Sequence, residues 1–316
     1  MKKVLKILLI IILVIILLIG VFIGKLILDT KKALRDGGYI EDWNDSNGIV
    51  YYDQAYGDGS ASHLYDLYIP SDADPEKPQA VMLFIHGGSW TSGTRKDMDY
   101  AAKRYAKAGY ITASMEYSLF QSDYTGITIS TILDEITACL EAIKARGAEL
   151  GFTIDQAALS GGSAGGHLAL LYSYSRADQS PIPLKFVFEQ TGPTDFHGDT
   201  WGVGSEFVAG FVSAFSGKTI TAEQVERGEA ENVIDSVSPA AWVNENTIPS
   251  LIAYGGRDSI VGTKQHLALI SKLEQYHVPY TYIEFPNSDH PLASDPDSRD
   301  AWHEAVLEYA KTYFGY

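Results

Sequence analysis

A serine lies within a glycine-rich stretch, Gly161-Gly162-Ser163-Ala164-Gly165, between a short apolar run and a segment rich in small residues. The pattern is G-x-S-x-G, which between a strand and a helix is typical of a tight turn that presents a serine hydroxyl as a nucleophile. Glycine-rich sequences produce this pattern by chance, so its position between strand and helix carries the prediction. A serine attacks only when a base removes its proton, so a histidine and an orienting carboxylate must follow.

His290 is the predicted base. It lies in the turn-rich segment Pro286-Asn287-Ser288-Asp289-His290-Pro291, directly after a predicted strand, where a loop can carry a side chain over the end of a sheet. Other histidines after Ser163 lie on or at the ends of predicted helices, where core or solvated roles are the ordinary expectation: His167, His266, His277 and His303.

Asp258 is the predicted orienting acid. It follows an apolar strand in Gly255-Gly256-Arg257-Asp258, and ligands bind beyond the carboxyl ends of strands in open sheets. Two other aspartates compete for this role. Asp289 is too close to His290 along the chain to reach the imidazole from behind, whereas Asp195 follows the preceding strand. The order serine, acid, histidine favours Asp258.

A second glycine motif, His86-Gly87-Gly88-Ser89-Trp90, follows the apolar strand expected over residues 81–85. Its glycines allow the backbone to approach a substrate, and acyl transfer needs fixed N–H donors for the oxyanion. We expect His86 to brace this loop rather than to transfer protons. The predicted oxyanion hole comprises the N–H groups of Gly87, Gly88 and Ala164, and the candidate substrate-pocket residues are Ser89 and Trp90.

Strands and helices alternate along the rest of the chain. Strands are predicted over residues 62–69, 81–85, 110–117, 157–160, 186–190, 250–254 and 281–285, and helices over 94–109, 129–143, 164–174, 263–276 and 298–313. Repeated strand–helix units with apolar strands predict a mostly parallel sheet that helices cover on both faces. From 197 to 246 this alternation stops, and the sequence becomes glycine-rich and aromatic, with two short helices expected.

The N-terminus predicts a membrane anchor over residues 1–28. An unbroken apolar run from Ile7 to Ile23 follows Lys2, Lys3 and Lys6, and is long enough to span most of a bilayer core. The alternative is a cleaved signal peptide, but no small-x-small cleavage site follows in residues 24–28. A linker is expected over 29–47 and the catalytic domain over 48–316. Because positive charges flank the span almost equally, orientation rests on the near-absence of cysteine, which favours an extracytoplasmic domain.

The composition excludes several classes of partner. The formal net charge is −16, and residues 1–36 hold seven Lys or Arg against two Asp, so the remainder is more acidic still, at −21. Such a surface repels nucleic acid. One cysteine, Cys139, excludes internal disulfides, and its neighbours predict a buried apolar role. Scattered histidines and carboxylates imply no metal, a triad needs no cofactor, and the oligomeric state stays open.

Over roughly residues 60 to 315, the chain resembles the hormone-sensitive-lipase-like and related carboxylesterase branch of the α/β hydrolases, with acetyl-xylan-esterase-like and formamidase-like members. The motifs that carry the resemblance are His86-Gly87-Gly88 with Trp90, the turn at Ser163, Asp258 with Val261, and His290. Two positions depart from the pattern. Ser89 replaces a third glycine, and Pro291 stands where glycine is frequent, which affects the approach to the base.

The resemblance implies the α/β-hydrolase fold with a cap insertion at about 197–246, whose aromatic residues are expected mainly to form the core of the cap rather than a ligand platform: Trp201, Phe207, Phe211 and Phe215. It also implies hydrolysis of carboxylic esters through an acyl-enzyme, with short acyl groups such as acetyl on carbohydrates. A peptidase, amidase or formamidase with the same triad is the alternative enzyme. An inactive binding module of the same fold is the alternative outside enzymes.

Overall fold

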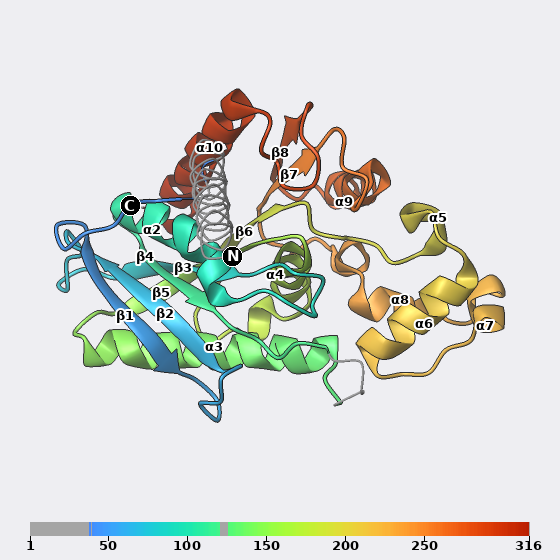
Figure 1. Ribbon diagram of the computed structural model, residues 1–316, viewed down its shortest axis with the longest axis horizontal. Helices are drawn as coiled ribbons and strands as arrows, with labels where there is room; N and C mark the ends of the chain where they lie inside the picture. Colours follow the sequence, from blue (N-terminus) through green and yellow to red (C-terminus); the bar gives the residue numbers. More distant parts are fainter. Residues whose placement is uncertain (1–37, 39, 121–125, 316) are drawn as a thin grey trace, which may run out of the picture. The chain divides into compact units, whose positions relative to one another are not determined.

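The computed structural model describes residues 38, 40–120 and 126–315. Residues 42–316 form one compact unit around an eight-stranded sheet with the strand order β1-β2-β4-β3-β5-β6-β7-β8 (Figure 1). The strands are β1 (Gly48–Ala55), β2 (Leu64–Pro70), β3 (Gln79–Ile85), β4 (Ile111–Met115), β5 (Ile154–Gly162), β6 (Leu184–Gln190), β7 (Ser250–Gly255) and β8 (Tyr280–Phe285).

The six strands from β4 to β8 in this order run parallel, and β2 and β1 are antiparallel additions at one edge. The mostly parallel sheet is therefore as predicted. Strand β1 is absent from the prediction. It is an edge strand whose Ile49 and Tyr52 are exposed, and its register shifts beside Asp53, which has a φ of +54°. Such a strand has neither an apolar run nor a clean alternation to reveal it.

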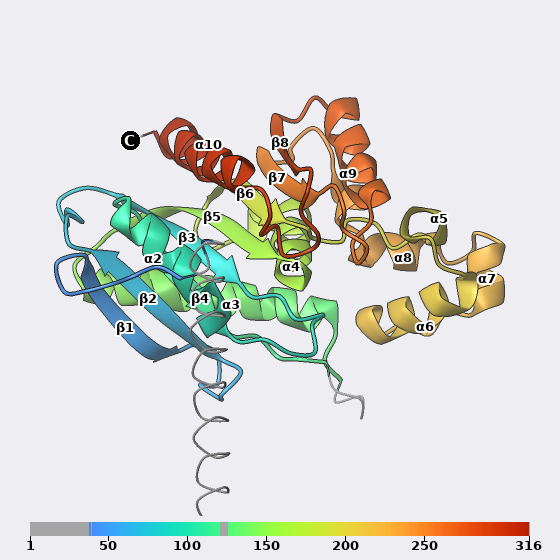
Figure 2. The ribbon, with the colours of Figure 1, turned by 45° about the horizontal axis from the view of Figure 1, so that its top comes forward.

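Helices cover both faces of the sheet, as the parallel strands require (Figures 1 and 2). One face packs against α2 (Asp99–Lys107) and α10 (Pro296–Phe314), and the other against α3 (Ile129–Glu149), α4 (Ala164–Ser175) and α9 (Thr263–Gln275). All seven residues of β3 are buried because both sides are covered. Cys139 lies fully buried on α3, in the predicted role.

The helix predicted from residue 94 is divided into two parts. Thr94 precedes the 3-10 helix η1 (Arg95–Met98), which continues as α2. The Thr94 N–H donates to Asp97 Oδ2 at 2.8 Å, so the acidic side chain in the first turn satisfies a free backbone donor. A second short 3-10 helix, η2 (Ala177–Gln179), follows α4.

The segment between β6 and β7 holds more helix than the two short helices predicted. It comprises α5 (Gly198–Trp201), α6 (Ser205–Ser216), α7 (Ala222–Glu226), α8 (Glu231–Val237) and the 3-10 helix η3 (Pro239–Trp242). In both ribbon views α5, α6 and α7 project beyond the end of the sheet (Figures 1 and 2). We call residues 197–246 the cap.

The predicted anchor, residues 1–28, and most of the predicted linker lie outside the described residues. Across the ranges that the structure covers, none of the helices has the length and apolar character needed to cross a membrane. The end of the linker is packed, because the ring of Trp43 makes an edge contact with that of Tyr68 at 6.1 Å between centroids.

Candidate active site

Ser163 occupies a strained turn between β5 and α4. Its φ of 55° and ψ of −124° lie outside the conformations usual for a residue with a side chain. The glycines around it are sterically necessary, because a Cβ on Gly165 would lie 2.0 Å from the Ile85 carbonyl oxygen. The Ser163 N–H donates to the Gln190 carbonyl at 2.8 Å, which fixes the turn to the end of β6. This is the geometry expected of a nucleophile turn.

Asp258 and His290, predicted as acid and base, are joined by a hydrogen bond of 2.8 Å from Nδ1 to Oδ2. The other carboxylate oxygen of Asp258 accepts the N–H groups of Ile260 and Val261 at 2.8 and 2.9 Å. The Asp258 side chain is fully buried, whereas that of His290 is 17% exposed. Because a carboxylate can only accept, Nδ1 carries the proton of this hydrogen bond, and the bond orients the ring so that Nε2 is the nitrogen left for a substrate or nucleophile.

The end of β6 brings the loop of His290 close to the serine turn. Gln190 accepts the Ser163 N–H, and the hydroxyl of the next residue, Thr191, donates to the His290 carbonyl at 3.5 Å. Within the part of the chain that is described, neither the Ser163 hydroxyl nor His290 Nε2 makes a hydrogen bond. Catalytic hydrogen bonds are often long or open without substrate, so the absence of this bond does not argue against a catalytic pair.

The loop after β3 passes directly against the serine turn. A Cβ on Gly87 would lie 2.9 Å from the Gly162 carbonyl oxygen and 3.4 Å from Ser163 Cβ. The next three residues have positive φ angles: 111° at Gly88, 53° at Ser89 and 60° at Trp90. Three successive left-handed residues, two of them with side chains, store strain next to the nucleophile. Ala164 begins α4, so its N–H lacks an intrahelical acceptor and is available to an oxyanion.

A buried network of charged and polar side chains supports the loop after β3. His86 Nδ1 contacts the Gly87 carbonyl at 2.7 Å, and its ring stacks on Tyr117 at 4.2 Å. His86 Nε2 lies 3.6 Å from Glu116 Oε2, and Arg95 Nη1 binds the other oxygen, Glu116 Oε1, at 2.8 Å. Arg95 Nε also binds the buried Asp66 at 2.9 Å. Burial lowers the pKa of His86, so a neutral imidazole braces the loop, in the predicted role.

Trp90 connects the loop to α4 and to the cap. Its Nε1–H donates to His167 Nδ1 at 3.2 Å, and His167 Nε2 donates to the Val237 carbonyl at 2.8 Å. Burial lowers the pKa of His167 to about 4, which keeps the imidazole neutral and able to accept on one nitrogen while it donates on the other. The sequence places His167 inside the helix that follows Ser163, but nothing local in the sequence pairs it with Trp90.

A pocket of about 380 Å³ opens beside Ser163. Its walls come from the loop after β3, from the cap and from the loop after β7. The lining residues are Ser89, Trp90, Thr91, Ser163, Pro193, Trp201, Phe211, Phe215, Ile260, Val261 and Gln265. The cap aromatics also pack on one another, with the rings of Phe211 and Phe215 3.9 Å apart. Trp201, Phe211 and Phe215 therefore serve both as cap core and as pocket wall, whereas Phe207 is exposed.

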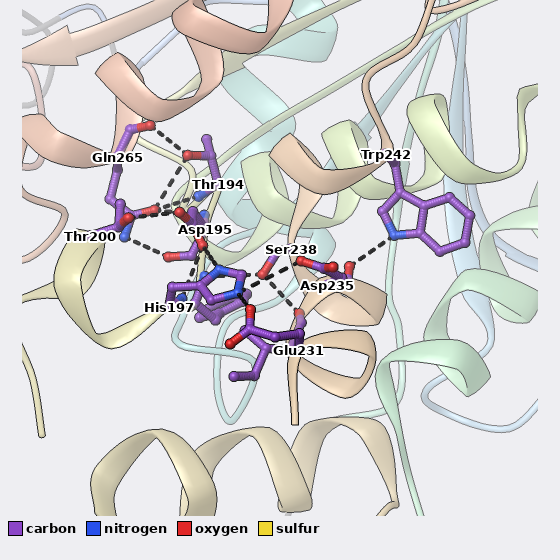
Figure 3. A network of polar contacts seen from close by, with 11 residues as sticks. Thr194, Asp195, His197, Thr200, Glu231, Asp235, Ser238, Trp242 and Gln265 are labelled. Atoms are coloured by element: carbon purple, nitrogen blue, oxygen red, sulfur yellow. Dashed lines mark hydrogen bonds and ion pairs between the residues drawn. The ribbon is translucent and has the colours of Figure 1, made fainter. Parts of the chain in front are cut away.

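Asp195, the alternative to Asp258, binds a different histidine. His197 Nδ1 lies 2.6 Å from Asp195 Oδ1, and His197 Nε2 lies 2.7 Å from Glu231 Oε2 on α8 (Figure 3). The hydrogen bond to Asp195 is the main reason that the pKa of His197 is raised to about 9. Gln265 on α9 holds the same loop, because its Oε1 accepts the N–H groups of Thr194 and Asp195. Asp195 thus secures the cap and does not orient His290.

Glu189, at the end of β6, is a buried carboxyl group that the sequence analysis did not single out. Its Oε2 accepts the Gly192 N–H at 2.7 Å, and a Cβ on Gly166 of α4 would lie 2.8 Å from the same oxygen. Burial raises its pKa to about 8, so it is mostly protonated at neutral pH. Glu189 therefore packs behind the serine turn as a neutral group.

In the ranges that the structure describes, no cluster of three or more His, Cys, Asp or Glu side chains could hold a metal ion. The chemistry available to the pocket comes from the serine turn, the Asp258–His290 pair and the backbone N–H groups around Gly87. That set is sufficient for acyl transfer to and from a hydroxyl group.

Comparisons with known proteins agree with this arrangement. The BD-FAE family matches residues 65–273. Esterase LipQ of Mycobacterium tuberculosis is 24% identical over 281 residues, which are 83% of this chain and 62% of LipQ. Esterase LipC of the same organism is 27% identical over 246 residues, or 74% of this chain and 58% of LipC. The chain thus spans about three fifths of the length of these curated relatives.

The fold is shared with solved structures. A truncated carbohydrate esterase from gut microbiota superposes with a TM-score of 0.68 at 16% identity, covering 86% of this chain and all of the other. This likeness confirms the predicted α/β-hydrolase fold, and the resemblance to the carboxylesterase branch is confirmed by the family match and the two esterase relatives.

Proposed function

We propose that this chain, which belongs to the BD-FAE family, is a carboxylesterase that uses Ser163 as nucleophile, His290 as base and Asp258 as orienting acid. The observation that carries the proposal is the 2.8 Å hydrogen bond between His290 Nδ1 and the buried side chain of Asp258. The loop that bears His290 contacts the end of β6, to which the strained turn of Ser163 is also bound. A carboxylate bound to Nδ1 fixes the imidazole in the tautomer that can take a proton on Nε2.

In the proposed mechanism, Ser163 Oγ attacks the ester carbonyl carbon while His290 Nε2 takes the hydroxyl proton. The N–H groups of Gly87, Gly88 and Ala164 stabilise the negative charge on the carbonyl oxygen. His290 then gives its proton to the departing alcohol, which leaves the acyl group on Ser163. A water molecule, deprotonated by His290, releases the acid and restores the serine. The Asp258 carboxylate stabilises the imidazolium that forms in each step.

The pocket supports an ester with a small acyl group, such as an acetyl ester of a carbohydrate. A volume of about 380 Å³ bounded by Trp90, Trp201 and Phe215 accommodates an apolar acyl chain and part of an alcohol. Aromatic walls also suit a sugar ring, which has apolar C–H faces. The names of LipQ and LipC support an ester substrate and say nothing of the acyl or alcohol group, and among the similar structures one is named a carbohydrate esterase.

Labelling with a fluorophosphonate probe, together with hydrolysis of p-nitrophenyl acetate, tests the proposal. The wild-type protein should be labelled and active, and Ser163→Ala should lose both properties while its circular dichroism is unchanged. A wild-type protein that is neither labelled nor active would indicate a binding module. Cleavage of short peptides or formamides without cleavage of p-nitrophenyl esters would instead assign the triad to a peptidase or amidase.

We also propose that the apolar run from Ile7 to Ile23 anchors the protein in a membrane with its catalytic domain outside the cytoplasm. The length of the run supports this proposal, and so does the lack of a cleavage site after it. Carbonate extraction should leave the protein in the membrane fraction. Protease added to intact cells should remove the catalytic domain, and protection of that domain would contradict the proposed orientation.

A further inference from the structure

A second pocket, of about 630 Å³, has a different set of lining residues from the catalytic pocket. The end of α6 contributes to both: Phe211 and Phe215 line the catalytic pocket, whereas Ser216 and, just after the helix, Lys218 line the second one. We call this second space the α3–cap pocket. Its walls are the beginning of α3, the end of α4, the end of α6, α8 and η3, so it joins the hydrolase body to the cap.

Serine hydroxyls give the α3–cap pocket hydrogen-bond acceptors. Ser175 Oγ donates to the Leu171 carbonyl at 2.5 Å, Ser216 Oγ to that of Val212 at 2.7 Å, and Ser236 Oγ to that of Val233 at 2.7 Å. Each hydroxyl proton is thus already used within its own helix. Ser216 Oγ also accepts the Lys218 N–H at 3.1 Å, which leaves it one lone pair, whereas Ser175 Oγ and Ser236 Oγ keep both lone pairs to accept hydrogen bonds from the O–H groups of a ligand.

Two cations supply donors to the same pocket. Arg176 pairs with Asp134 of α3, a carboxylate that lines the same pocket and offsets its charge, and Arg176 Nη2 donates to Ser130 Oγ at 2.9 Å. Lys218 differs, because no carboxylate pairs with it in the ranges that the structure describes. In a chain with a formal net charge of −16, an unpaired ammonium group at the rim of a pocket favours an anionic ligand.

Trp242 gives the pocket an exposed aromatic surface. Its side chain is 40% exposed, and its Nε1–H donates to the Asp235 carbonyl at 3.1 Å (Figure 3). That hydrogen bond fixes the indole ring before any ligand arrives, so little side-chain entropy is lost on binding. Ile129 and Leu133 of α3 add apolar surface to the same pocket.

From these groups we infer that the α3–cap pocket binds an acidic saccharide, meaning a sugar chain that carries carboxylate groups. A sugar ring presents an apolar C–H face, which suits Trp242, and hydroxyls at its rim, which suit the serine acceptors and the Arg176 donors. The carboxylate of a uronic acid residue completes the set by pairing with Lys218. The pocket lies apart from Ser163, so this inference does not depend on the proposed esterase activity.

Titration calorimetry with full-length protein in detergent tests the inference, using tetragalacturonate and the uncharged cellotetraose as probes. We expect tetragalacturonate to bind more tightly, and its affinity to fall as salt is added. Trp242→Ala should weaken binding of tetragalacturonate about tenfold, the loss expected for one aromatic contact. Lys218→Ala should weaken the binding of tetragalacturonate about tenfold and leave the affinity for cellotetraose unchanged.

Matched controls separate this pocket from the rest of the surface. Tyr52→Ala removes an exposed aromatic residue from β1, and Lys311→Ala removes an exposed lysine from α10, so neither should change binding. Ile260→Trp narrows the catalytic pocket, and it should also leave the affinity unchanged. The inference is overturned if neither saccharide binds, if both bind equally, if Trp242→Ala binds normally, or if Ile260→Trp abolishes binding. These outcomes do not depend on whether the protein hydrolyses esters.

Discussion

Two Asp–His pairs lie near the carboxyl end of the sheet, and they differ in what the second imidazole nitrogen contacts. In the pair formed by Asp258 and His290, the carboxylate binds Nδ1, and Nε2 has no hydrogen-bond partner among the described residues. In the pair formed by Asp195 and His197, the carboxylate binds Nδ1 and Glu231 binds Nε2. The first imidazole therefore has a nitrogen that can take a proton, whereas both nitrogens of the second are bound to carboxylates that hold it as a cation.

The comparison teaches that a carboxylate beside a histidine does not by itself make a catalytic base. A base needs one nitrogen that is free to accept a proton from a nucleophile. His197 has both nitrogens committed to carboxylates, and its raised pKa of about 9 means that it is protonated at neutral pH. It therefore acts as a positive charge that ties α8 of the cap to the loop after β6, which bears Asp195 (Figure 3).

Removal of the imidazole from each pair should give the largest contrast. His290→Ala should lower kcat for p-nitrophenyl acetate by about 10⁴- to 10⁶-fold, because triad members act as a unit. His197→Ala should keep kcat within about tenfold of the wild-type value, because His197 only positions the cap. Steady-state kinetics at pH 7 measures both, with circular dichroism as the check on folding. Equal losses in the two variants would show that the wrong base has been assigned.

Replacement of each carboxylate by an amide should give the next largest contrast. Asp258→Asn should lower kcat by about 10³- to 10⁴-fold, because the amide favours the wrong imidazole tautomer. Asp195→Asn should leave kcat within a few fold of the wild type. If Asp195→Asn were the more damaging change, Asp195 would be the acid of the triad.

The cap pair should affect substrate binding more than chemistry. His197 precedes α5, whose Trp201 lines the catalytic pocket, so a loosened cap should raise KM for p-nitrophenyl butyrate by about three- to tenfold. Lys144→Ala is a suitable control, because Lys144 Nζ binds the Pro181 carbonyl and contacts neither the cap nor the Asp195–His197 pair, so KM should not change. A change in kcat with unchanged KM would argue against a positioning role for His197.

The smallest effect concerns stability and its dependence on pH. The folded protein raises the pKa of His197 above its usual 6.5 to about 9, so the stabilisation is complete below about pH 6.5 and is lost as pH rises through about 9. His197→Ala should therefore lower the free energy of unfolding by about 1–2 kcal/mol at pH 6, a value reduced for partial exposure. Urea denaturation of the wild type and of His197→Ala should show this difference in the free energy of unfolding at pH 6. The difference should fall towards zero above pH 9. A difference that is constant with pH would mean that packing, not charge, accounts for it.

Local sequence patterns were enough to predict several parts of this protein. The buried parallel strands read as apolar runs, and the steric need for glycine around Ser163 and at Gly87 and Gly88 marked the two turns of the candidate site. The position of Asp258 and His290 directly after strands indicated that both would reach the same edge of the sheet. The edge strand β1 and the full helical content of the cap had no comparable local signal.

Which side chains contact one another depends on the folded chain and could not be predicted from local patterns. Nothing near Asp195 in the sequence shows that Glu231, from a separate helix of the cap, binds the second nitrogen of His197 and so makes it a cation. The contact between Trp90 and His167 and the grouping of Lys218, Arg176 and Trp242 in one pocket likewise join segments that are distant along the chain. The physical reason is that hydrogen bonding and charge depend on distances in space, which long-range packing sets and local sequence patterns do not encode.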